Sequence, residues 1–255
     1  MSWFNFLPFF DSAQLWVGER FGKHGLTWYA GEPVGVQHVF AALFVLIVLS
    51  IMAVLAYGKV KNAADAIVPD EKLTVRTFME LMVGTVYSMM SDIMGAKAAK
   101  FFLPLIGTCA LFILFSNAMG LLPGFLPPTD KLNTTLVLGV IIFLTTHIYG
   151  VKEHGLSYFK HFFGPIIKWY ALPLMLLMLV IELISHFVRP LSLAMRLMAN
   201  IVADHAVVAV FFAMVPFLVP VPMMLLGVMV VVVQTLVFCL LSTVYISMAI
   251  AHEEH

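Results

Sequence analysis

Residues 206–251 read AVVAVFFAMVPFLVPVPMMLLGVMVVVVQTLVFCLLSTVYISMAIA and contain no Asp, Glu, Lys, Arg or His. A helix that crosses the roughly 30 Å hydrocarbon core of a bilayer needs about 20 apolar residues. Pro216, Pro220 and Pro222 interrupt the run, and proline breaks helices. The run therefore predicts the end of one membrane helix, a turn and a second membrane helix.

The composition of the whole chain agrees with a membrane protein. Of 255 residues, 62% are hydrophobic and 11% are charged, against about 25% charged in soluble domains. These values exclude a water-soluble enzyme and a disordered chain. The formal net charge is zero, so we expect no nucleic acid partner. Cys109 and Cys239 stand far apart in apolar runs, which indicates buried thiols.

Further apolar segments lie upstream, and they define the fold class and the domains. We expect an all-α integral membrane protein with five spanning helices. Two lie near 39–58 and 132–150, one lies within 101–129, which reads as a span followed by a Pro- and Gly-rich turn, and two longer ones lie near 169–215 and 222–251. Small polar residues recur at three- and four-residue spacing in 71–94, which predicts one amphipathic, membrane-lying helix. Residues 1–38 form an external or interfacial segment, 39–251 a single membrane domain and 252–255 a tail.

The placement of Lys and Arg predicts the orientation. Loops 59–100 and 151–168 hold nine of these residues, whereas the opposite side holds Arg20, Lys23 and Lys131. Positive charge favours the cytoplasmic side. We therefore expect an external N-terminus and a cytoplasmic C-terminus.

Polar side chains form a stripe in the fourth span. On a helical wheel of about 100° per residue, six of them share one narrow face about 27 Å long. They are Glu182, Ser185, Arg189, Ser192, Arg196 and Asn200. Asp204 lies at the edge of that face, and His205 lies on the other side.

Arg196 is the costliest member of the stripe, because Arg at mid-bilayer costs roughly 2.5–3.5 kcal/mol on insertion scales. Glu182 and Asp204 stand about 21 Å and 12 Å away along the helix, too far for direct pairing. Arg196 is therefore expected to face water or an anion from another helix or subunit. Arg189, beside Pro190, has two interpretations. It is either a functional cation or a side chain that extends its charged group to the water at the end of the helix.

Two other polar groups have open interpretations. Asp204 and His205 could relay protons or form a hydrogen-bonded structural pair. In the last span, Gln234 and Tyr245 share a face and could join helices or line a water path.

The remaining motifs carry no chemistry. His252-Glu-Glu-His255 lacks the His-Glu-x-x-His spacing of a zinc site, so we expect a solvated tail and no metal. No phosphate loop or nucleotide motif is present, so we expect no cofactor and no ATP chemistry on this chain.

The segment PLSLAMRLMAN at 190–200 resembles the Pro-x-Ser-x-x-x-Arg-Leu-x-x-Asn motif of subunit a of the rotary F-type ATP synthase, bacterial type. Gln234 followed by Phe238 and TVYISMA at 243–249 is similar to the last helix of that family. The segments FME at 78–80, NAMGLLP at 117–123 and NTTL at 133–136 match as well.

This resemblance implies a proton-translocating, non-hydrolytic subunit of the bacterial inner membrane. Such a subunit packs its two long, tilted last helices against a c-subunit ring and contacts the b-subunit peripheral stalk, other synthase subunits and lipid. Arg196 matches the essential arginine, and Asn200, Glu182 and Gln234 match residues of the two half-channels.

Four positions depart from the common bacterial pattern. His205 replaces a Glu, Asp204 replaces a Gly, Gly227 replaces a His or Glu, and Gly120 replaces an Asp. The usual acid–imidazole pair between two helices is thus shifted onto neighbouring positions of one helix.

We expect protons to enter near Asp204, His205, Asn200 and Gln234, and to leave past Glu182, Ser185 and His186. Ser192 and Tyr245 are expected to add to the channel lining. The alternative is a secondary transporter that binds an anionic substrate at the intramembrane Arg. That class commonly shows internal repeats, and none is visible in this sequence.

Overall fold

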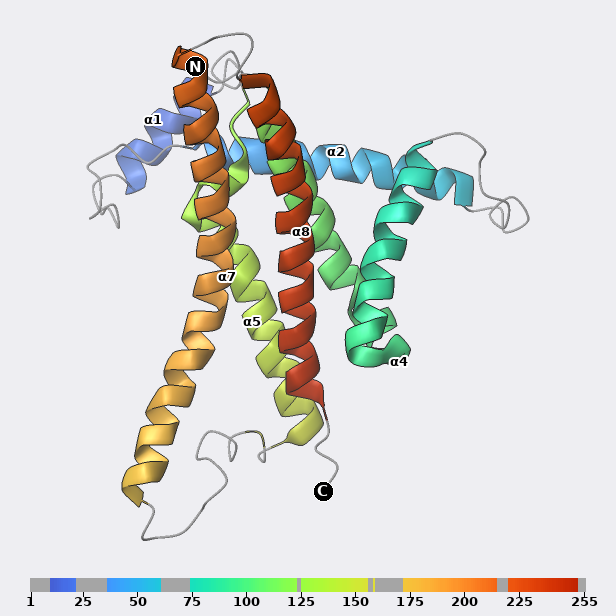
Figure 1. Ribbon diagram of the computed structural model, residues 1–255, viewed down its shortest axis with the longest axis vertical. Helices are drawn as coiled ribbons and strands as arrows, with labels where there is room; N and C mark the ends of the chain where they lie inside the picture. Colours follow the sequence, from blue (N-terminus) through green and yellow to red (C-terminus); the bar gives the residue numbers. More distant parts are fainter. Residues whose placement is uncertain are drawn as a thin grey trace.

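The computed structural model describes residues 10–21, 36–60, 74–122, 125–155, 158, 172–214 and 220–251. These residues form helices and turns and no strand, which confirms the predicted all-α class (Figure 1). The elements are α1 (Phe10–Phe21), α2 (Gln37–Val60), α4 (Val75–Gly120), the 3-10 helix η3 (Pro128–Asp130), α5 (Leu132–His154), α7 (Leu172–Met214) and α8 (Pro220–Ile250).

Five of these helices are long and apolar enough to cross a membrane, namely α2, α4, α5, α7 and α8. The predicted number of membrane helices is therefore confirmed for the described part of the chain. Upstream of them, α1 is a helix that the sequence pattern did not predict. Its Phe10 is buried, and the ring centroids of Phe10 and Phe40 lie 5.7 Å apart. The tail 252–255, Pro216 and most of the loop 151–168 lie outside the described residues.

Helix α4 is two helical legs joined at a kink. Gly95 has φ 78° and ψ 156°, a conformation that glycine adopts without the steric cost of a side chain. Figure 1 shows α4 as two legs that meet at a turn. The first leg begins after Thr74, whose Oγ1 accepts a hydrogen bond from the backbone N–H of Thr77, and it coincides with most of the predicted amphipathic helix. The second leg is the apolar one and ends at Gly120.

Helices α7 and α8 are longer than a bilayer is thick. Their 43 and 31 residues correspond to about 65 Å and 46 Å, against a hydrocarbon core of about 30 Å. The 24 residues of α2 give about 36 Å, and Figure 1 shows α2 running across the direction of α7 and α8. If α2 crosses the membrane along the membrane normal, α7 and α8 are strongly tilted away from that normal.

The buried core lies where the second leg of α4 meets α2, α5, α7 and α8. Ile113, Ile142, Leu197 and Phe238 are buried there. Helices α5 and α7 approach closely because Gly139 has no side chain: a β-carbon there would lie 2.7 Å from the carbonyl oxygen of Pro190. This contact holds one side of α7 against the rest of the protein.

Candidate functional site

Helix α7 has one packed side and one open side. Leu193, Leu197 and Ile201 are buried against the neighbouring helices, whereas Leu191 and Met195 are 42% and 47% exposed. Apolar side chains are thus exposed along a helix that also carries the polar stripe. Within the described residues, this open side of α7 has no helix covering it.

Arg196 lies on the open side. Its side chain is exposed and lines a shallow hollow with apolar neighbours and the half-buried Ser192. Within the described part of the chain, Arg196 forms no ion pair. The expectation that neither Glu182 nor Asp204 pairs with it is therefore confirmed.

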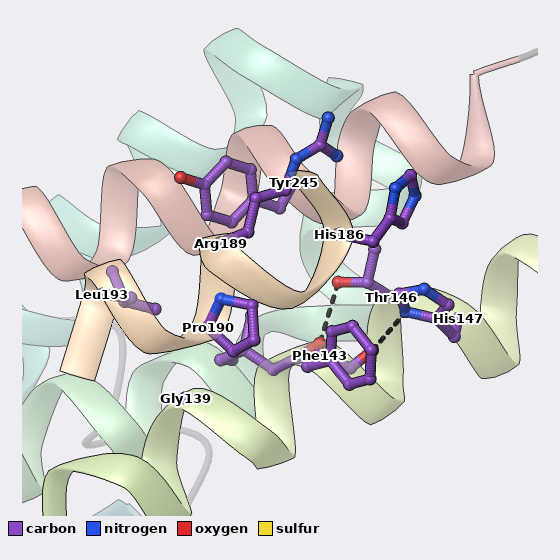
Figure 2. A pocket seen from close by; sticks show the side chains of 10 residues that line it. Gly139, Phe143, Thr146, His147, His186, Arg189, Pro190, Leu193 and Tyr245 are labelled. Atoms are coloured by element: carbon purple, nitrogen blue, oxygen red, sulfur yellow. Dashed lines mark hydrogen bonds between the residues drawn. The ribbon is translucent and has the colours of Figure 1, made fainter. Parts of the chain in front are cut away.

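Arg189, two turns away on the same helix, is held by its own chain. Its guanidinium carbon lies 5.7 Å from the centroid of the Tyr245 ring on α8. A cation over an aromatic face is attracted by the ring quadrupole. Figure 2 shows Arg189 and Tyr245 beside one small cavity, together with Pro190 and Leu193. The Tyr245 side chain therefore belongs to the neighbourhood of Arg189.

The first turns of the polar stripe form a titratable cluster. His186 Nδ1 lies 3.3 Å from Glu182 Oε1 and 2.9 Å from the Glu182 carbonyl oxygen. Ser185 is half-buried on the same turn. A third group comes from α5, because the ring centroids of His147 and His186 are 5.2 Å apart. Sequence reasoning did not select His147, although a histidine in an otherwise apolar span is a visible signal.

Asp204 and His205, about one turn beyond the last residue of the polar stripe, contact two different neighbours. A β-carbon on Gly227 of α8 would lie 2.9 Å from Asp204 Oδ2, and one on Gly120 of α4 would lie 2.7 Å from His205 Nε2. Among the described residues, Asp204 and His205 form no ion pair or hydrogen bond with each other. The two side chains do not form the direct pair considered from the sequence, because consecutive helix positions point about 100° apart.

The same contacts relate the four positions that depart from the common bacterial pattern to one another. Asp204 occupies the space beside Gly227, and His205 occupies the space beside Gly120. Each glycine is therefore matched by a larger titratable side chain on α7. Asn200 and Gln234 are both half-buried, on α7 and α8 respectively.

Asp130, in η3, is a further titratable residue that the sequence analysis missed. η3 contacts α2, α4, α5 and α7. Burial raises the pKa of the Asp130 carboxyl, while the nearby charges of Lys131, His38 and His205 lower it. The carboxyl is thus electrostatically coupled to His205, and it lies at the same end of α7 as Asp204.

These features define a class of protein: a helical membrane protein with an exposed guanidinium that has no ion pair among the described residues, and with titratable groups on both sides of it along one helix. Residues 39–247 match the family described as ATP synthase A chain. The chain is 43% identical over 240 residues to ATP synthase subunit a of Sorangium cellulosum (strain So ce56), covering 94% of this chain and 90% of that protein. It is 45% identical over 215 residues to ATP synthase subunit a of Geobacter sulfurreducens (strain ATCC 51573 / DSM 12127 / PCA), covering 84% and 90%.

The chain therefore belongs to the ATP synthase subunit a family. It is a multi-pass membrane protein, a member of the ATP synthase complex and the membrane-sector subunit for proton translocation. A secondary transporter is not favoured.

Proposed function

We propose that this chain is the stator that couples proton movement to rotation of a c-subunit ring, with Arg196 facing the ring. The observation that carries this proposal is the exposed Arg196 guanidinium on an apolar surface, with no ion pair in the described part of the chain. Such a charge is costly in a bilayer. A carboxylate that arrives on a neighbouring subunit offsets that cost.

The charge of Arg196 acts on the ring carboxylate in two ways. At 4 Å and an effective dielectric constant of about 20, opposite charges attract by about 4 kcal/mol. This attraction favours the ionised carboxylate, so the ring gives up its proton before it passes Arg196. Because a guanidinium does not lose its own proton in proteins, it also blocks protons from crossing directly between the two paths.

The two ends of the stripe supply the two proton paths. On the outer side, Asp204, His205, Asn200 and Gln234 guide protons to the ring carboxylate. On the inner side, Glu182, Ser185 and His186 receive them, and Ser192 and Tyr245 complete the lining. Asp204 against Gly227 and His205 against Gly120 support an outer path between α7, α8 and the end of α4.

The surroundings follow from this assignment. The N-terminus is external and the C-terminus cytoplasmic, as the distribution of Lys and Arg favours. The c-ring covers the open side of α7, and the b-subunit peripheral stalk and lipid contact other exposed apolar surfaces. Each proton that crosses 100 mV supplies about 2.3 kcal/mol, so several must pass for each ATP.

The test is ATP-driven proton pumping by the complete synthase in proteoliposomes with Arg196→Ala. We expect pumping to be lost while the c-ring and the hydrolytic subunits still copurify with the variant chain. Lys100→Ala, which removes another exposed cation, is the matched control and should pump at the normal rate. Normal pumping by Arg196→Ala would overturn the proposal.

A further inference from the structure

We propose that His147 of α5 carries protons on the inner path, as the partner of His186 on α7. This inference rests on the proposed function, because it adds a residue to the path that begins at Glu182. Nothing in the family motif includes His147. The inference comes from the position of two imidazoles on two different helices.

Both histidines line one small cavity between α5, α7 and α8. Their ring centroids are 5.2 Å apart and their planes are 76° from parallel. Figure 2 shows the two rings side by side at one end of this cavity, with Arg189 and Tyr245 toward the other. A proton that reaches His186 is therefore within one water molecule of His147.

The hydrogen bonds of the two rings set which nitrogen can take up a proton. Nδ1 of His147 lies 2.9 Å from the carbonyl oxygen of Phe143, and Nδ1 of His186 lies 2.9 Å from the carbonyl oxygen of Glu182. A carbonyl oxygen only accepts hydrogen bonds, so Nδ1 is the donor in both neutral rings. Nε2 is then the nitrogen that gains a proton.

The transfer step follows from these tautomers. The Nε2–H bond of the His186 imidazolium breaks, one water passes the proton on, and a new Nε2–H bond forms on His147. No electrons are transferred, and His186 returns to its neutral form. Arg189 faces the same cavity, and its positive charge disfavours the state in which both rings are charged. The pair therefore carries one proton at a time.

Tyr158 extends the group of neighbouring side chains from His147 to the segment after α5. The Tyr158 ring lies 6.0 Å from the His147 ring, and it fits there because Gly150 has no side chain. Burial raises the pKa of Tyr158, the Arg189 charge lowers it and the Glu182 charge raises it. The phenol is therefore protonated at neutral pH and can donate a hydrogen bond. Glu182, His186, His147 and Tyr158 thus form one continuous group from α7 to the segment after α5.

The experiment compares His147→Gln with wild type in the complete synthase in proteoliposomes, by ATP-driven proton pumping. Glutamine keeps a polar side chain but does not titrate. We expect at least a tenfold lower pumping rate, since a positioned proton-transfer group typically contributes 10²–10⁴-fold. His154→Gln, at a second histidine of α5, is the matched control and should retain the wild-type rate.

A second variant separates proton transfer from packing. His147→Ala should be slow in plain buffer and should recover severalfold when imidazole is added, whereas a packing role gives no such recovery. Pumping by His147→Gln within twofold of wild type, or a slow His147→Ala with no response to imidazole, would overturn the inference. Either result leaves the proposed function intact as long as Arg196→Ala abolishes pumping.

Discussion

Arg189 and Arg196 are the same residue type, seven positions apart on one helix, and the structure gives them opposite surroundings. Arg189 is half-buried, faces a cavity of its own chain and lies over the Tyr245 ring. Arg196 is exposed among apolar side chains and forms no ion pair in the described part of the chain. One guanidinium is therefore compensated by an aromatic ring of its own chain, and the other has no ion pair among the described residues.

This difference shows that two residues on nearly the same face of a helix can have different surroundings. The two residues differ by only about 20° around α7, but they straddle the boundary between its packed and open sides. Arg189 reaches toward α8, and Arg196 reaches into the shallow hollow beside Met195. Residues of one polar stripe can thus have packed and exposed surroundings within two turns of a helix.

The largest expected effect comes from a comparison of two single variants, in which either Arg196 or Arg189 is replaced by lysine. Arg196→Lys should lower coupled ATP synthesis at least about 100-fold, the size of loss typical when one positioned hydrogen-bond donor is removed. Lysine keeps the charge but can lose its proton in apolar surroundings, which opens a leak between the two paths. Arg189→Lys should lose less than about threefold, because lysine also binds an aromatic face. Equal losses at the two positions would contradict the comparison.

The membrane helices and the polar stripe could be predicted from the sequence, because both depend on local periodicity. Helix α7 continues through Pro190, so the wheel drawn from the sequence applies to it. The contacts of His147 and His205 could not be predicted, because they depend on which helices become neighbours. The span and turn expected over 101–129 agree with a second leg of α4 that ends at Gly120, but the 3-10 helix η3 within that turn was not predicted.

The next effect concerns the part of α7 that carries Asp204 and His205, where these two side chains contact different helices. Asp204→Asn combined with His205→Ala should slow proton transport about tenfold in both directions, because one path serves synthesis and hydrolysis. ATP synthesis and ATP-driven pumping in the same proteoliposomes measure the two directions. Unchanged rates would show that the outer path runs elsewhere. A loss in only one direction would contradict a shared path.

A smaller effect should come from the packed side of α7. Gly139→Ala places a β-carbon 2.7 Å from the Pro190 carbonyl oxygen, so α5 and α7 must separate. Overpacking of this kind typically costs about 1–3 kcal/mol. A β-carbon at Gly84 would have no atom within 4 Å apart from the nearby backbone of its own helix. Gly84→Ala is therefore the control, and it should be neutral or should stabilise the complex. Thermal unfolding of the purified complex in detergent compares them, and equal melting temperatures would contradict the close approach.

The smallest effect is expected at Asp130, which lies in η3 close to the part of α7 that carries His205. Burial raises its pKa, and Lys131, His38 and His205 partly offset this. A carboxyl whose pKa is raised by folding stabilises the protein below its unfolded pKa of about 3.9 and loses that contribution as the pH rises through the folded value. At pH 7 the buried charge therefore lowers stability. Asp130→Asn should raise the melting temperature at pH 7 by no more than about 4 °C, with the difference vanishing near pH 4. A lower melting temperature at pH 7 would show that the attraction of Lys131, His38 and His205 for the carboxylate outweighs burial. Asp130 would then resemble Arg189, a charge compensated within its own chain.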